Sequence, residues 1–280
     1  MPIVRVALLG DVVGRPGREA FRHAVPVLRG EHGADVVIVN AENARHGRGL
    51  HPVGMGELFD AGADALSLGD HYFDDERIAD ALRDPAVPVS APCNVVEPEG
   101  AARWSLVRTD VGATIAHIGV IGRLFMPVEH PEPFSAIDRT LESLLEVEPD
   151  ALAIVDMHCE ATSEKAACAF HCLWNWPGTV VGVTGTHTHV QTNDARLLDG
   201  RLGAVTDLGM CGAHGGVIGF DARASTERIV EQKPSRLELA ETELEATGVL
   251  LDVDTALRRA TRIRTVRVPS PVPDGLSRGG

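Results

Sequence analysis

The stretch VVGVTGTHTHVQT (residues 180–192) begins as an apolar run and ends in two histidines, His187 and His189. A valine-rich run bounded by glycine is typical of a strand that is buried on both faces. In extended backbone the side chains at positions i and i+2 point to the same side, so both imidazoles would face one way. The stretch therefore predicts a buried strand that ends either in a solvated turn or in part of a metal site.

Short runs of the same kind recur along the 280-residue chain and determine the expected fold. The runs lie at 3–10, 34–40, 63–69, 114–122, 151–156, 179–185 and 202–209, and helix-like segments lie at 16–30, 54–61, 74–83, 136–147 and 163–173. Alternation of strand and helix predicts an α/β fold with a largely parallel sheet. After about residue 236, the segments LELAETEL, GVLLDVD and TRIRTVRV predict antiparallel strands that complete the same domain.

The composition indicates a globular chain with one domain over residues 1–267 and a loose tail over 268–280, which is rich in Pro, Gly and Ser. No run of eighteen apolar residues is present, so we expect no membrane span.

The five cysteines form no C-x-x-C pair, which argues against a disulfide framework and fits reduced thiols in the cytoplasm. The net charge of −14 argues against stable nucleic-acid binding but leaves room for a small anionic substrate.

Five of the expected strands are followed at once by side chains that can bind a metal ion. In chain order these are Asp11, Glu42 and Asn43, Asp70, His158, and the pair His187 and His189. Ligands in open α/β sheets bind beyond the carboxyl ends of the strands, and imidazoles and carboxylates are common metal ligands. Each residue alone has an ordinary explanation, such as a turn aspartate or a surface histidine. Together they are too many for one ion and predict two ions about 3.5–4 Å apart, with Glu42 able to bridge them.

Six motifs also resemble a known family. They are GDVVGRPGR (10–18), NAEN (40–43), GDH (69–71), VDMHCEATSEK (155–165), GTHTHVQTNDARLL (185–198) and TDLGM (206–210). The chain resembles the YmdB-like metallophosphoesterases, a bacterial family of 2′,3′-cyclic-nucleotide 2′-phosphodiesterases within the calcineurin-like superfamily. The resemblance implies a metallophosphoesterase-like β-sandwich core flanked by helices, with two iron or manganese ions at the carboxyl ends of strands.

The resemblance also implies a role for each residue. Asp11, Glu42, Asn43 and His189 would hold one ion, and Glu42, Asp70, His158 and His187 would hold the other. His71 would be the proton donor. The chain departs from the family at Asp70, because the family motif is usually GNH and an aspartate adds a negative charge there.

The implied reaction converts 2′,3′-cyclic nucleotides to 3′-nucleotides. The ions would acidify a water whose hydroxide attacks phosphorus in line, and His71 would protonate the leaving ribose 2′-oxygen. Arg15, Arg45 and Arg48 are candidates for contacting phosphate or base, with solvated loop arginines as the alternative. Lys165 receives no role.

Two rival functions use the same site. One is a broad phosphomonoesterase or protein phosphatase, and the other is a non-enzymatic regulator that senses a cyclic nucleotide. Family analogy also implies a homo-oligomer, which exposed apolar helix faces could support. In every case we expect a small-molecule substrate or ligand and no membrane partner.

Overall fold

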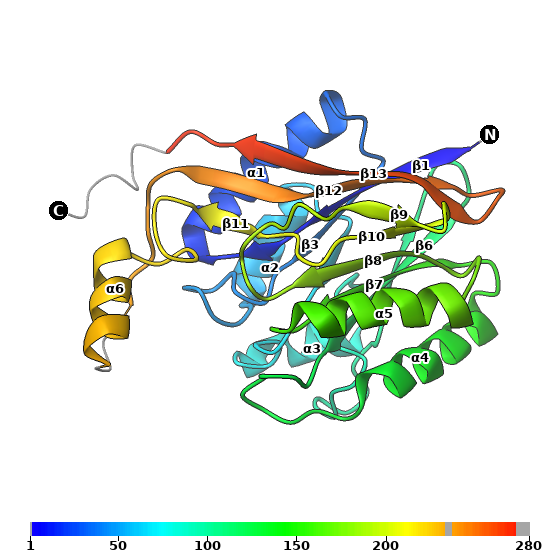
Figure 1. Cartoon of the computed structure of the whole chain (residues 1–280), viewed down its shortest axis with the longest axis horizontal. Helices are drawn as coiled ribbons and strands as arrows, with labels where there is room; N and C mark the ends of the chain where they lie inside the picture. The colour runs from blue at the N-terminus through cyan, green and yellow to red at the C-terminus, as the bar shows by residue number, and fades with distance from the viewer. Residues whose placement is uncertain (1, 233–236, 273–280) are drawn as a thin grey trace.

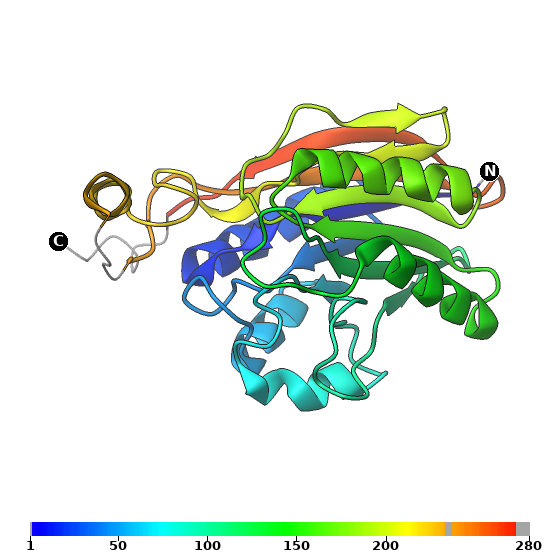
Figure 2. The same ribbon diagram turned by 60° about the horizontal axis from the view of Figure 1, so that its bottom comes forward.

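The computed structural model describes residues 2–232 and 237–272 of the chain. Within these residues two β-sheets lie face to face, and helices cover both outer surfaces (Figures 1 and 2). The first sheet has the order β2-β11-β12-β1-β3-β4, with β13 paired to β12. Its strands are β1 (Ile3–Leu9), β2 (Asp11–Val12), β3 (Val36–Asn40), β4 (Ala65–Ser67), β11 (Met210–Ala213), β12 (Leu244–Asp254) and β13 (Arg259–Pro269).

The second sheet has the order β5-β6-β7-β8-β10-β9. Its strands are β5 (Ser105–Arg108), β6 (Thr114–Ile121), β7 (Leu152–His158), β8 (Val180–Thr186), β9 (Arg196–Leu198) and β10 (Leu202–Ala204). Strands β6, β7, β8 and β10 are parallel to one another, as are β1, β3 and β4 in the first sheet. The parallel α/β prediction is therefore confirmed for the middle of the second sheet and for one side of the first.

The apolar runs of the strands form the core between the two sheets. Leu8 of β1 and Ile38 of β3 pack in one cluster with Ile154 of β7 and Val181 of β8. Burying such side chains contributes about 1.5–3 kcal/mol each. The predicted β-sandwich is therefore held by the same valine, isoleucine and leucine residues that identified its strands.

Helices pack on the outer face of each sheet. The helices are α1 (Gly14–Gly30), α2 (Pro52–Asp60), the 3₁₀ turn η1 (Glu76–Ile78) with α3 (Ala79–Arg83), α4 (Pro133–Val147), α5 (Thr162–Asn175) and α6 (Ala222–Glu231). Phe21 and Leu28 of α1 lie seven residues apart on one helix face and are fully buried against the first sheet with Leu58 of α2. Ile137 of α4 and Cys172 of α5 cover the second sheet. Helix α6 stands apart from the sandwich, at the left of both views (Figures 1 and 2).

The C-terminal strands fit the sequence only in part. GVLLDVD and TRIRTVRV form β12 and β13, which pair antiparallel as predicted. The prediction of a strand at LELAETEL was wrong: Leu239 makes one isolated bridge to Phe220, and β12 begins at Leu244. This segment bonds to the loop before α6 instead, for example from the amide of Ala240 to the carbonyl of Gly219. The run 202–209 is also shorter than predicted, since β10 ends at Ala204.

The last strand extends past residue 267, where we expected the domain to end. Strand β13 continues to Pro269, and Val268 is buried where it pairs with Ala246 of β12. Residues 273–280 of the expected tail lie outside the described residues. Over 2–232 and 237–272, no helix combines the length and apolar character that crossing a bilayer requires.

Candidate metal centre

The carboxyl ends of strands from both sheets meet at one end of the sandwich, and the predicted metal ligands lie there. The first sheet supplies oxygen donors after β1, β3 and β4, and the second sheet supplies imidazoles at the ends of β7 and β8. The residues are Asp11, Glu42, Asn43 and Asp70 from the first sheet, and His158, His187 and His189 from the second. The strand-end rule holds across two sheets; the alternation of strands and helices had suggested a single parallel sheet, and the family resemblance had implied the sandwich.

Asp11 is held in a tight backbone environment. Its amide donates to the carbonyl of Gly209 at 3.2 Å, and a Cβ on the preceding Gly10 would lie 1.9 Å from that same oxygen. The Oδ2 atom accepts the amide of His187 at 3.2 Å, but Oδ1 is buried and has no hydrogen-bond partner among residues 2–232 and 237–272. Burial raises the pKa of Asp11. A buried carboxylate oxygen without a partner is rare and fits a cation-binding role.

His158 lies at the centre of the group and is fully buried. Its Nε2 is 2.8 Å from Asp70 Oδ1, 3.3 Å from Glu42 Oε1 and 3.2 Å from His187 Nδ1. Two of these neighbours are carboxylate oxygens that can only accept when ionised, so the cluster requires a shared proton or a cation.

The other nitrogen of His158 is fixed by two further side chains. Nδ1 is 2.8 Å from Thr186 Oγ1, which lies 3.0 Å from Asp156 Oδ2. When Asp156 is ionised, Thr186 donates to it and accepts from Nδ1–H, which leaves a lone pair on Nε2 facing the cluster. Burial raises the pKa of Asp156 to about 7, although the charge on His158 opposes that rise.

The pKa values within the cluster reflect the same charges. Burial disfavours the imidazolium of His158, but Glu42 and Asp70 outweigh burial and raise the pKa of His158 well above its ordinary value. Burial also disfavours the carboxylates of Glu42 and Asp70, but their contacts with His158 lower both pKa values. Positive charge is therefore stabilised at the point where these side chains converge.

Asn43 and His189 form the remaining part of the centre. The amide nitrogen of Asn43 donates to Glu42 Oε1 at 3.0 Å and lies 3.2 Å from His189 Nε2. His189 Nδ1 is 3.0 Å from the carbonyl oxygen of Ile218, which can only accept. Nδ1 therefore carries the hydrogen, and Nε2 presents its lone pair to the site.

Two overlapping groups of ligand atoms result, each with its atoms within 4.8 Å of one another. Asp70, His158 and His187 form the first, which contains three of the four residues expected for one ion. Asp11 and Glu42 form the second together with His158, and Asn43, which the resemblance placed with them, donates to the same Glu42 carboxylate. Overlapping groups of carboxylates and imidazoles can hold adjacent divalent cations.

His71 lies beside these groups with its imidazole partly exposed. Its amide donates to Glu42 Oε2 at 2.9 Å, and its Nδ1 is 3.1 Å from Asp74 Oδ2. Its Nε2 is 4.0 Å from Asp70 Oδ2. The ring is thus oriented by Asp74 and stays outside both groups of ligand atoms.

The three arginines are not brought into these groups. Arg48 bonds to Asp74, and Arg45 Nη1 is 3.1 Å from Asp75 Oδ2. Arg15 is exposed at the start of α1 and lines a cavity of about 360 Å³ with residues of α1 and α2. Arg48 therefore reaches the site only through Asp74, which it shares with His71.

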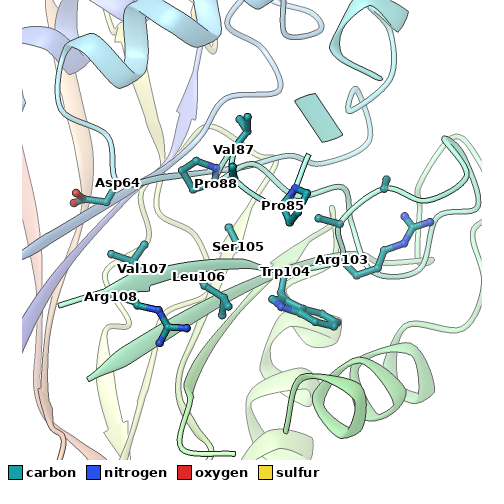
Figure 3. A pocket seen from close by; sticks show the side chains of 13 residues that line it. Asp64, Pro85, Val87, Pro88, Arg103, Trp104, Ser105, Leu106, Val107 and Arg108 are labelled. Carbon is teal, nitrogen blue, oxygen red and sulfur yellow. The ribbon is translucent and has the colours of Figure 1, made fainter. Parts of the chain in front are cut away.

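A larger cavity lies away from the centre, between β5 and residues 85–88 (Figure 3). It has a volume of about 520 Å³, and none of the candidate ligands lines it. Its two arginines are already engaged: Arg103 donates to the carbonyl of Pro92, and Arg108 pairs with Glu148. This cavity offers no group suited to the chemistry of the strand-end site.

Sequence reasoning missed several residues that support the ligands. Thr186 and Asp156 orient His158, Asn40 Oδ1 accepts the amide of Glu42 at 3.0 Å, and Glu160 Oε2 lies 3.5 Å from His187 Nε2. These residues lie inside or beside the motifs NAEN, VDMHCE and GTHTH. The motif positions could have marked them as neighbours of the site, but their contacts depend on the packing of separate strands.

Comparison with known proteins places the chain among phosphoesterases. A sequence model of a family described as YmdB-like protein matches residues 7–266. The 2′,3′-cyclic-nucleotide 2′-phosphodiesterase of Bacillus subtilis (strain 168) is 34% identical over 266 residues, which are 95% of this chain and 97% of the relative. A putative phosphatase/phosphodiesterase of Mycoplasma pneumoniae is 30% identical over 273 residues, covering 96% of this chain and 94% of the relative.

Two solved structures share the fold. The crystal structure of a hypothetical protein from Thermus thermophilus matches with a TM-score of 0.84 and 32% identity, covering 96% of this chain and 100% of the other. The crystal structure of a novel phosphatase from Mycoplasma pneumoniae matches with a TM-score of 0.84 and 27% identity, covering 100% and 98%.

Proposed function

The chain belongs to the YmdB-like family, and from that premise we propose that it hydrolyses 2′,3′-cyclic nucleotides to 3′-nucleotides with two divalent metal ions. Its family and relatives support a phosphodiesterase or phosphatase. The observation that carries the dinuclear proposal is the pair of overlapping ligand groups at the strand ends. Asp11 Oδ1, inside one of these groups, has no hydrogen-bond partner in the described part of the chain, which supports it further.

The residues present fit two ions. Asp11, Glu42, Asn43 and His189 would hold one, and Glu42, Asp70, His158 and His187 the other, with Glu42 shared. Asn43 would bind through its amide oxygen, so its amide has to turn over from the orientation in which its nitrogen faces Glu42 and His189. A mixed set of oxygen and imidazole donors without thiolates suits iron or manganese.

When bound, the ions would supply a water that is acidic enough to be deprotonated near neutral pH and would neutralise charge on the phosphate. The protein's own groups then orient the reaction. The Asn40 side chain and the His71 amide hold the backbone and carboxylate of Glu42. Asp74 engages Nδ1 of His71, which leaves Nε2 to donate a proton to the departing ribose 2′-oxygen.

Two further features support proposals about the setting of the enzyme. All five cysteines are free, which favours a reducing cytoplasm. Ile229 and Val230 of α6 are largely exposed, and they favour contacts within a homo-oligomer.

The test is a substrate comparison with Mn²⁺-loaded protein. We expect turnover of 2′,3′-cyclic AMP with 3′-AMP as the product, and much slower turnover of nucleoside monophosphates and phosphopeptides. Equal or faster turnover of the monoesters would favour the broad phosphatase that the names of the Mycoplasma relatives suggest. Binding of the cyclic nucleotide without turnover would favour the regulator.

A further inference from the structure

A buried ion pair lies next to the centre, and the proposed chemistry does not use it. Lys165 is one of only two lysines in the sequence and lies in the first turn of α5. Its Nζ is 2.7 Å from Asp207 Oδ2, and the two side chains are 1% and 2% exposed. Removing two charges from water is costly, and a buried pair is therefore weak evidence for a purely stabilising role.

The carboxylate of Asp207 links this pair to the metal ligands. Oδ2 accepts the hydroxyl of Thr188 at 2.8 Å and the amide of Thr188 at 3.3 Å, and Oδ1 accepts the amide of Gly209 at 2.8 Å. Thr188 lies between His187 and His189. The ion pair thus contacts the single residue that connects two candidate ligands.

The backbone of this turn is strained. His187 has φ = 99° and His189 has φ = 63°, both in the left-handed region that residues with a Cβ rarely adopt. Strained backbone persists only where the surrounding structure over-determines it, and it clusters at functional sites. The two bonds from Thr188 to Asp207 provide that support from within the protein.

We propose that the Lys165–Asp207 pair positions the turn His187–Thr188–His189 so that its two imidazoles reach two different ions. The proposal rests on the dinuclear centre of the proposed function. Lys165 holds the carboxylate of Asp207 in place, and Asp207 holds Thr188. Without Lys165, the buried carboxylate of Asp207 would lose its charged partner and would hold Thr188 less firmly. The turn would then relax toward ordinary φ values and move both imidazoles.

This arrangement predicts a specific signature. Because the turn carries one ligand for each ion, losing the pair should weaken both binding steps together. Substitution of a single ligand residue should weaken mainly the binding of one of the two ions. Lys165 and Asp207 contact no reacting atom in this scheme, so they are positioning residues.

The experiment compares Lys165→Met with Lys165→Arg, and uses Arg5→Met, in a partly exposed ion pair away from the site, as a control for the loss of a cation. Arg5 pairs with Asp252 at 2.6 Å across β1 and β12, at the opposite end of β1 from Asp11. Metal-free proteins are titrated with Mn²⁺ by calorimetry, and the absorption spectra of the Co²⁺-loaded proteins are recorded. Loss of a group that orients metal ligands typically weakens affinity about 10–100-fold.

We expect Lys165→Met to lose about 10–100-fold in both Mn²⁺ binding steps and to show altered Co²⁺ bands. Lys165→Arg should recover most of the affinity, and Arg5→Met should match wild type. Wild-type affinity and spectrum in Lys165→Met would overturn the proposal. Failure of wild type to bind metal would instead remove the dinuclear centre, and this inference with it.

Thr188→Val keeps the test decisive if Lys165→Met does not fold. This variant preserves the ion pair and removes the hydroxyl that donates to Asp207 and that also accepts the amide of Val190 at 3.5 Å. It should weaken both Mn²⁺ steps by about 10-fold, at the lower end of the range for such supporting contacts. Unchanged affinity in Thr188→Val would overturn the link between the ion pair and the turn.

Discussion

Replacing Thr186 by valine should weaken metal binding without touching a ligand. The side chain is fully buried, and its hydroxyl connects His158 Nδ1, at 2.8 Å, to Asp156 Oδ2, at 3.0 Å. Valine keeps the branched shape and removes the hydroxyl. His158 Nδ1 then loses its hydroxyl acceptor and keeps the longer contact with the side-chain nitrogen of Asn40, at 3.5 Å, which cannot accept its hydrogen.

The magnitude follows from these contacts. Removing a group that orients a ligating histidine costs about 10–100-fold in metal affinity. That loss corresponds to about 1.4–2.7 kcal/mol of binding free energy. The metal-free protein should also be less stable, since a buried polar group left without a partner costs about 1–3 kcal/mol.

A neighbouring threonine provides the control. Thr184 is equally buried on the same strand, and its hydroxyl donates to Asp156 at 3.3 Å, but His158 has no contact with it among the hydrogen bonds of the described residues. In calorimetric titration with Mn²⁺, Thr184→Val should stay within about threefold of wild type, because every ligand keeps its partner. Equal losses of Mn²⁺ affinity in Thr184→Val and Thr186→Val would show that the affinity depends on the contacts of Asp156 and not on the hydroxyl beside His158. Wild-type affinity in Thr186→Val would refute the claim that this hydroxyl sets the orientation of His158.

Three further predictions concern single residues. His71→Ala should slow turnover of 2′,3′-cyclic AMP about 10²–10⁴-fold while elemental analysis still finds both metals; loss of the metals would make His71 a ligand. Asp70→Asn should keep both ions and remain active, because an amide oxygen can occupy the same position, and a metal-free Asp70→Asn would show that the carboxylate is essential. Burial lowers the pKa of His117 to about 4, so the unfolded chain binds more protons than the folded one between about pH 6.5 and 4. Folding stability should therefore be intact above that window and fall through it by about 3 kcal/mol in total. Urea unfolding of metal-free His117→Leu should lack this part of the pH dependence, and parallel curves for the two proteins would contradict the assignment.

The strands and their polar ends could be predicted because they are encoded locally. The run before His187 becomes β8, which ends at Thr186, and the run before Glu42 becomes β3, which ends at Asn40. Each polar residue follows its strand within a few positions. A parallel arrangement then brings such residues together without further information from the sequence.

The division into two sheets could not be predicted in this way. Strand β12 pairs with β1 although the two are more than 230 residues apart, and no local pattern reports such a partner. LELAETEL illustrates the same limit, since its alternation is typical of a strand but its hydrogen bonds go to a loop. Strand identity depends on a partner as well as on the pattern.

The contacts that support the candidate ligands could not be predicted from the sequence for a related reason. Lys165 and Asp207 are separated by 42 positions, and Thr186 and His158 by 28. A lysine in a predicted helix is normally interpreted as a solvated surface residue, because lysine is almost never fully buried unless it is paired. Only the packing of α5 beside β8 places its ammonium group against Asp207.

The position of β12 has a consequence for how the protein is made. This strand lies in the interior of the first sheet, between β11 and β1, and Thr247 within it accepts the amide of Gly10, directly before Asp11. Every candidate ligand has been translated once residue 189 leaves the ribosome, yet the strand that holds the first of them is still about 55 residues away. A nascent chain at that stage lacks the strand that pairs with one edge of β1 and lacks Val249, Leu251 and Val253 of the core between the sheets. Such long-range pairing forms slowly. We therefore expect the candidate site to be completed late in folding, and a chain truncated before β12 should carry every candidate ligand without arranging them.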